Sequence, residues 1–212
     1  MDSQFATKVT SLYRTYIEVI KPLLAEIEIR YQKFPIPILN EIRAFNDHIA
    51  RCHREDISSA NIDKEIKKAE GHIYRIILDC YKFLNVAFHE NLIEKFDKRT
   101  RGVDLNAVNN GQFSASYFET RKFIISHLKK AKFLEAMDKD ESLKEYEIVY
   151  NKFSELETFL SENERHICWA KARYFSNKII KAIWWLVAII FGYILSLILP
   201  SIPWDRLFSF FK

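Results

Sequence analysis

The hydrophobic positions of this chain follow two patterns, one periodic and one continuous. Over most of its length, apolar residues recur every three or four positions, the spacing that places them on one face of a helix. From Ala182 to Trp204 the chain instead runs through 23 consecutive uncharged residues. A bilayer core about 30 Å thick needs about 20 apolar residues in a helix. We therefore expect residues 176–204 to form a transmembrane helix with its interfacial flanks.

The periodic part predicts helices joined by short connections. Glycine is scarce, and no alternating apolar pattern is long enough to argue for a sheet. The sequence therefore predicts an all-α protein with an antiparallel helical bundle over residues 1–175. Helices are expected over residues 3–34, 37–52, 61–99, 114–137 and 140–160. Predicted inward-facing residues include Leu92 on the third helix and Phe118, Ile125, Leu128 and Phe133 on the fourth.

Prolines and capping residues predict where these helices bend, begin and end. Pro22 lacks an N–H group and should kink the first helix near Glu18. Pro35 and Pro37 should end that helix. The fifth helix is expected to run into the span, with at most a hinge near residues 161–163, which would couple the bundle to the membrane. Candidate N-caps are Asn61, then Ser114 or Ser116, then Asp140 or Ser142.

The charges that flank the span predict its orientation. Basic residues are frequent before it and few after it, so the positive-inside rule places the bundle in the cytoplasm. No secretory signal pattern opens the chain. We therefore expect a single-pass membrane protein, with residues 205–212 as a short interfacial tail. The alternative, a buried core helix, conflicts with so long an uncharged stretch.

Arginine, histidine and aspartate recur on two of the expected helices. Arg43, Asp47 and His48 lie on the second helix. His72, Arg75 and Asp79 follow at i, i+3 and i+7 on the third. Asp47, His72, Arg75 and Asp79 could form a polar network with Arg43 between the helices, because buried charges must be paired. The three cysteines are widely spaced and include no CxxC pair, so neither a metal site nor a cofactor is expected.

The stretches EIRAFNDHIARC and KAEGHIYRIILDCYKFL, which hold these residues, resemble the HEPN-like helical proteins of prokaryotic defence systems. Those families use an Arg followed after four to six residues by a His, and Arg43 and His48 fit that spacing. The resemblance implies that the pair acts on RNA across a dimer interface. In such chemistry the Arg stabilises a phosphorane and the His moves the proton of the 2′-hydroxyl. Some HEPN-like accessory proteins of type VI CRISPR systems are membrane pores.

A basic region and an acidic region follow each other along the chain. Residues 94–132 hold nine Lys or Arg against four Asp or Glu, and residues 133–164 hold three Lys against ten acidic residues. Positive charge interleaved with aromatic rings suits a nucleotide or a short nucleic acid. The alternative is a solvated face, or pairing with the acidic helix of a neighbouring molecule. The candidate ligand-binding residues are Lys98, Arg99, Arg101, Arg121, Lys122, Lys129 and Lys130.

Within the span, Ala188, Gly192 and Ser196 are spaced by four residues. Small residues at this spacing let helices approach closely in lipid, so they mark a candidate self-association face or pore lining. The alternative is a lone anchor. We predict a homo-oligomer of four or more copies, since one helix cannot enclose a pore.

Together with the resemblance to HEPN-like proteins, these features favour an oligomeric effector of antiphage defence in the bacterial inner membrane. Its C-terminal helices would form a pore, controlled by a nucleotide or oligonucleotide bound to the cytosolic domain or by the protein that makes this signal. A membrane-tethered, metal-independent ribonuclease using Arg43 and His48 is the second hypothesis. A passive tail-anchored adaptor is the third. No Walker A loop or GxGxxG motif occurs, so ATP-driven work is not expected.

Overall fold

The protein is all-helical in the part that the structure describes. The computed structural model describes residues 3–31 and 34–198, and no strand occurs within those ranges. The predicted fold class is therefore confirmed at this level. The main helices are α1 (Ser3–Thr15), α2 (Lys21–Tyr31), α3 (Ile36–Arg51), α4 (Ser59–Phe88), α5 (Lys95–Arg99), α6 (Gln112–Leu134), α7 (Lys139–Glu162) and α8 (Glu164–Ile198). Two π-helical turns are η1 (Tyr16–Ile20) and η2 (His89–Glu94), and two 3₁₀ turns are η3 (Leu105–Ala107) and η4 (Asn109–Gly111).

The chain divides into two compact units. The first comprises residues 1–99 and 115–162, and the second comprises residues 100–114 and 163–212. The boundary at residue 175 that the sequence suggested lies inside α8. The predicted interfacial tail at 205–212, with Trp204 before it, lies outside the described residues.

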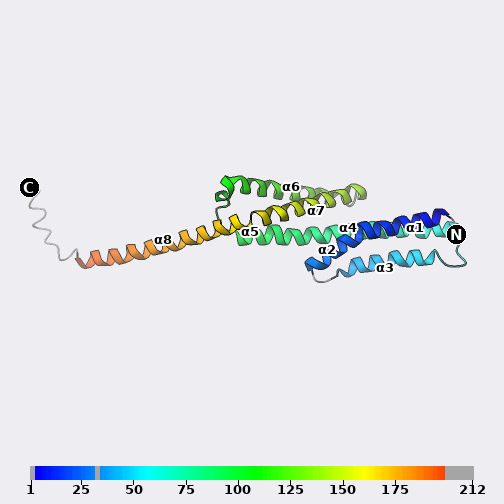
Figure 1. Cartoon of the computed structure of the whole chain (residues 1–212), viewed down its shortest axis with the longest axis horizontal. Coiled ribbons are helices and arrows are strands. Elements are labelled where there is room, and N and C mark those ends of the chain that lie inside the picture. The colour runs from blue at the N-terminus through cyan, green and yellow to red at the C-terminus, as the bar shows by residue number, and fades with distance from the viewer. Residues whose placement is uncertain (1–2, 32–33, 199–212) are drawn as a thin grey trace, which may run out of the picture. The chain divides into compact units, whose positions relative to one another are not determined.

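The first unit is built around α4. Helices α2, α3 and α7 all pack against this 30-residue helix, and α3 runs alongside it (Figure 1). Burial of large apolar side chains from each of these helices supplies the main stabilisation, at about 1.5–3 kcal/mol for each. The fully buried side chains include Ile27, Ile38, Phe45, Ile76, Leu84, Phe88 and Phe153.

Two π turns interrupt the long helices of this unit. Pro22 cannot donate to the carbonyl one turn earlier, and η1 lies where the sequence predicted a kink near Glu18. The second turn, η2, was not predicted. A π turn carries one extra residue, so it moves the buried position from Leu92 to Ile93, which is 2% exposed. The predicted inward position of Leu92 was therefore wrong by one residue.

Helix α6 buries a different face from the predicted one. Tyr117, Ile124 and Ala131 are fully buried, whereas Phe118 and Phe133 are 51% and 68% exposed. The buried residues follow an i, i+7, i+14 spacing. This spacing is harder to recognise in the sequence than the line of large apolar residues, because its last member is a small alanine. Expecting Phe118 and Phe133 to point inward was therefore wrong.

The helix starts also differ from the predicted caps. Helix α4 begins after Ser58 rather than at Asn61. The carboxylate of Asp138 accepts hydrogen bonds from the backbone N–H groups of Asp140 and Glu141, so Asp138 caps α7. Ser142, one of the predicted caps, is buried and donates to the carbonyl of Ala131 instead.

The second unit contains α8 and the loop before α6. Gly102 has φ +79°, and a Cβ atom there would lie 2.6 Å from the hydroxyl of Tyr174, so the loop requires glycine. Asn109 donates to the side chain of Asn163 at 3.0 Å. Asn163 separates α8 from the end of α7, so the helix is interrupted within the predicted hinge.

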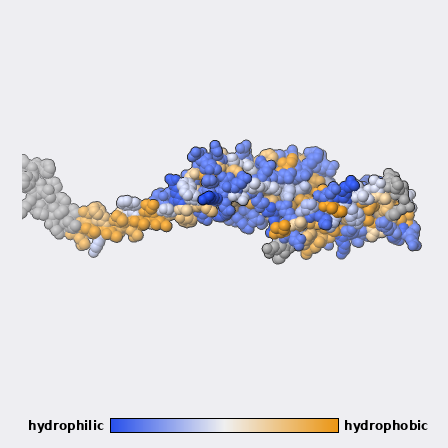
Figure 2. All heavy atoms as spheres, viewed as in Figure 1, coloured by the Kyte–Doolittle hydropathy of each residue, from blue (hydrophilic) through white to orange (hydrophobic). Residues whose placement is uncertain are grey.

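Helix α8 exposes its apolar side chains over its entire C-terminal half. In Figure 2 this half is continuously hydrophobic. The helix is long and apolar enough to cross a membrane, and its most apolar part is 0% buried. A core helix of a soluble protein would be mostly buried. The structure therefore agrees with one C-terminal membrane-spanning helix.

Candidate functional site

Two histidines lie side by side between α3 and α4. The rings of His48 and His72 stack with their centroids 5.0 Å apart, and each side chain is at most 14% exposed. Seven residues separate Glu41 from His48 on α3, and seven separate Glu65 from His72 on α4, so each pair shares one helix face. We call Glu41, His48, Glu65, His72 and Arg75 the paired-histidine cluster.

One carboxylate holds His48 from the opposite helix. Nδ1 of His48 lies 2.6 Å from Oε2 of Glu65, and Lys68 donates to the other carboxylate oxygen at 2.6 Å. The hydrogen bond from Lys68, then that from His48, lowers the pKa of Glu65 to about 2, against a small opposing effect of burial. Glu65 is therefore an anion at neutral pH and fixes the orientation of the His48 ring.

Glu41 and Arg75 hold the second histidine. Nδ1 of His72 lies 2.6 Å from Oε2 of Glu41, and Nε of Arg75 donates to the same oxygen at 2.7 Å. Burial opposes ionisation of Glu41, but the hydrogen bonds from Arg75 and His72 outweigh it and lower the pKa. Nη2 of Arg75 is also 2.7 Å from Nδ1 of His72. Because arginine only donates, Nδ1 either accepts from Arg75 or donates to Glu41, and the two bonds exclude each other.

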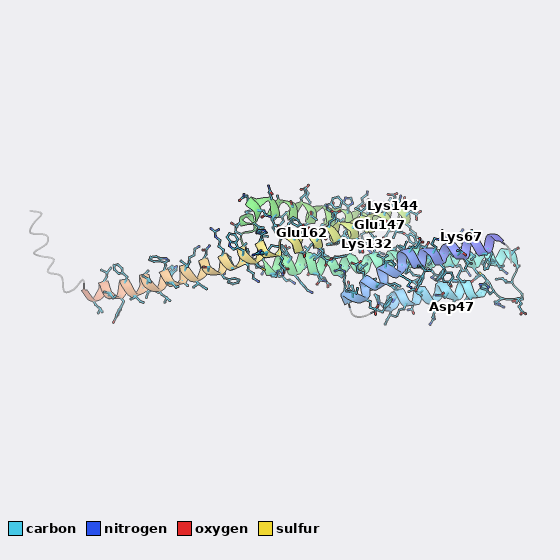
Figure 3. All side chains as sticks on the ribbon, in the orientation of Figure 1. Asp47, Lys67, Lys132, Lys144, Glu147 and Glu162 are labelled. Carbon is cyan, nitrogen blue, oxygen red and sulfur yellow. The ribbon has the colours of Figure 1, made fainter. Side chains whose placement is uncertain are left out.

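The structure brings together only some of the residues predicted for the polar network. His72 and Arg75 are joined through Glu41, which the sequence reasoning missed together with Glu65. Arg43 is exposed on α3, as is Asp47, which Figure 3 labels. Within the described ranges neither forms a side-chain ion pair, so neither takes part in the predicted polar network. The sequence feature that could have indicated Glu41 and Glu65 is that each precedes a histidine of its own helix by seven residues, which places it on the same face as that histidine.

Asp79 lies one turn beyond Arg75 on α4 and is half-buried. Burial raises its pKa, while the nearby Lys82 acts in the opposite direction. No hydrogen bond joins its side chain to the paired-histidine cluster in the described part of the chain.

The paired-histidine cluster has the groups needed for acid–base chemistry. Two imidazoles, each oriented by a carboxylate, carry ring nitrogens that can donate or accept a proton. Arg75 supplies positive charge beside them and also lines a cavity of about 450 Å³ together with Gly71 and Tyr74. Among the described residues, no group of three or more His, Cys, Asp or Glu side chains could hold a metal ion.

The basic candidate residues are divided among several local interactions. Arg121 pairs with Asp97 at 2.9 Å, and Lys130 pairs with Glu145 at 2.5 Å. Lys98 is 3.9 Å from Glu94, and the Arg99 guanidinium lies 5.9 Å from the Phe96 ring centroid. These intramolecular contacts neutralise part of the positive charge that was predicted to bind a ligand. Lys122 and Lys129 are exposed on α6, and Arg101 belongs to the second unit.

Glu145 anchors a third histidine–carboxylate pair, which the sequence reasoning missed. It is 4% exposed and receives Nδ1 of His127 at 2.6 Å in addition to Lys130. Burial opposes its ionisation, but the hydrogen bonds from Lys130 and His127 prevail and lower its pKa. The acidic helix α7 thus pairs with the basic α6 of its own chain.

The small-residue stripe lies on the exposed surface of α8. A Cβ atom built on Gly192 meets no heavy atom within 4 Å, and Ser196 donates only to the backbone carbonyl of Tyr193, at 2.7 Å. Nothing within the described chain packs on this face at Gly192.

Comparison of the chain with protein-family models, with curated proteins and with solved structures finds no match in any of the three. The resemblance to HEPN-like proteins therefore stays a prediction, and function must be argued from the geometry.

The low pKa of Glu65 predicts how stability depends on pH. A carboxyl with pKa about 2 in the folded protein and 4.5 when unperturbed stabilises the fold above pH 4.5, and this contribution disappears as the pH falls from 4.5 to 2. We expect Glu65→Gln to make the melting temperature less sensitive to pH across that window. Circular dichroism melts of both proteins in one detergent at pH 5 and pH 3 measure this. An equally steep loss in the variant would contradict it.

Proposed function

We propose that this chain is a single-pass inner-membrane protein with its N-terminal unit in the cytoplasm. The observation that carries the proposal is the fully exposed apolar half of α8. Arg173, Lys178 and Lys181 precede that half. Their positive charge favours a cytoplasmic location for the N-terminal side of the span. Trp184 and Trp185, both exposed, are suited to headgroup depth.

We further propose that several copies assemble through α8 into a pore, as an effector of antiphage defence controlled by a signal at the helical unit. The support for assembly is the unpacked face at Gly192. In lipid, helices associate by close packing of such faces, because no hydrophobic drive remains. The defence role rests on the resemblance to HEPN-like proteins.

Gly192→Leu tests the assembly. A Cβ atom at this position meets no heavy atom of the described chain within 4 Å, so we expect the larger side chain to act mainly through contacts with other molecules. We expect the detergent-solubilised protein to fall from a particle of four or more copies to smaller species, and propidium entry into expressing cells to drop at least tenfold. Ile194→Phe, which adds bulk about 200° around the helix, is the matched control. A monomeric wild type, or equal dye entry in both variants, would contradict the proposal.

A metal-independent ribonuclease is the second candidate, favoured by the paired histidines. The guanidinium beside them is that of Arg75, at 2.7 Å from Nδ1 of His72, whereas Arg43 is exposed. Toxicity that survives Gly192→Leu but is lost with His48→Ala and His72→Ala, together with RNA cleavage by the purified protein, would favour the nuclease over the pore. Retained toxicity in the histidine variants would exclude it as the cause.

A further inference from the structure

A polar cavity of about 400 Å³ lies where α3 ends and α4 begins. It is distinct from the predicted basic region on α5 and α6. Three cationic side chains line it, from the end of α3, the connecting turn and the second turn of α4. Its polar lining consists of Arg51, Arg54, Asp56, Asn61, Lys64 and Glu65.

The cationic side chains of this cavity have unused hydrogen-bond donors. Arg51 is 53% exposed, and its one ion pair within the described residues is a long 3.7 Å contact with Glu65. Arg54 is 64% exposed and donates once, to Asp56 at 3.4 Å. Lys64 has no side-chain partner among the described residues. A guanidinium carries five N–H donors, so most of this donor capacity faces water.

The two carboxylates of the lining do not cancel this charge. Glu65 is already bonded to Lys68 and His48, so little of its charge is left for the cavity. Asp56 is 76% exposed, and solvent screens its pairing with Arg54. The cavity therefore keeps a positive potential.

The start of α4 lies beside this cavity, and Asn61 of its first turn belongs to the lining. This 30-residue helix begins at Ser59, and the side chain of Ser58 caps none of its N–H groups. The N–H groups of Asn61 and Ile62 both reach the carbonyl of Ser58, which leaves those of the first two helical residues without an intrahelical partner. A long helix start with free donors favours an anion.

We propose that this cavity binds the diphosphate or triphosphate group of a small phosphorylated molecule. Two guanidinium groups and an ammonium suit several phosphate oxygens at once. Ile57 is the apolar member of the lining, and no aromatic ring lines the cavity among the described residues, so recognition rests on the phosphates rather than on a base. This assigns a site and a chemical class to the controlling signal; only the role as signal rests on the proposed function.

Calorimetry of the full chain in detergent with tripolyphosphate, ATP and AMP tests the site. We expect tripolyphosphate and ATP to bind with affinities within about tenfold of each other, and AMP at least tenfold more weakly, because AMP lacks the additional phosphate oxygens for the charge-assisted hydrogen bonds. Tight binding of ATP without binding of tripolyphosphate would overturn the proposal, since the base would then carry recognition.

Paired variants localise the binding. Arg54→Gln with Lys64→Gln should weaken tripolyphosphate binding at least tenfold, whereas Arg14→Gln with Lys21→Gln removes the same charge from exposed positions of α1 and α2 and should leave it within twofold. Asp56→Asn removes an exposed anion and should tighten binding severalfold, a gain that misfolding cannot produce. Equal losses in both double variants, or no gain with Asp56→Asn, would overturn the proposal. Dye entry is measured separately, so a failed pore leaves the binding result intact.

Discussion

Replacing Val187, Ile190 and Ile194 with aspartate is expected to release the protein from the membrane. All three side chains are exposed near the middle of the apolar half of α8. Each aspartate at a bilayer centre costs about 2.5–3.5 kcal/mol, so the three together cost about 7.5–10.5 kcal/mol, enough to offset most of the favourable transfer of the helix. Carbonate extraction of cell membranes, followed by blotting of pellet and supernatant, measures the release.

The matched control replaces the same three residues with leucine, which keeps the length and apolar character of the segment. This variant should stay in the carbonate-resistant pellet with the wild type. If the aspartate variant also stays in the pellet, α8 does not hold the protein in the bilayer and the proposed topology fails.

Phe88→Ala is expected to cause the largest loss of stability in the first unit. Phe88 is 0% exposed, stacks on Phe153 with ring centroids 5.4 Å apart, and lies 4.0 Å beneath the guanidinium carbon of Arg30. Truncation of a buried phenylalanine costs about 3–5 kcal/mol. It also removes the ring beneath a cation that is tied to Glu26 and Glu157 at 2.8 Å. We expect the melting temperature in detergent to fall by about 10 °C.

Phe133→Ala is the control for this prediction. Its ring is 68% exposed on α6, so truncation should change stability by no more than about 0.5 kcal/mol. A large loss with Phe133→Ala and a small one with Phe88→Ala would mean that α6 and α4 bury other faces than those described.

Apolar spacing was enough to predict the helices and their inward faces where large side chains dominate. On α3, the large apolar residues Ile38, Phe45 and Ile49, spaced by seven and four positions, are all buried. Apolar spacing predicted the wrong face on α6, where bulky Phe118 is exposed and small Ala131 is buried. The spacing argument favours large apolar side chains, whereas a close-packed core selects side chains that fit the available space.

The site was less predictable because its partners lie on different helices. His48 and His72 were recognisable as candidates, but Glu65 and Glu41 became their partners only through the register of α3 against α4. A short motif such as Arg-x4-His contains no information on that register. Arg43 matched the motif and yet is exposed, while Arg75, outside the motif, lies beside the histidines.

The π turn at Tyr16–Ile20 has a consequence for how this chain tolerates changes in length. Phe5, Leu12, Ile20 and Ile27 are all buried, with spacings of seven, eight and seven residues. The eighth residue is absorbed inside the helix, so the stripe stays in line on both sides of it. The segment formed by α1, η1 and α2 therefore has a heptad repeat of buried residues with one additional residue in the middle. The wider π turn accommodates this residue without a loop, so the buried residues after it still face the core.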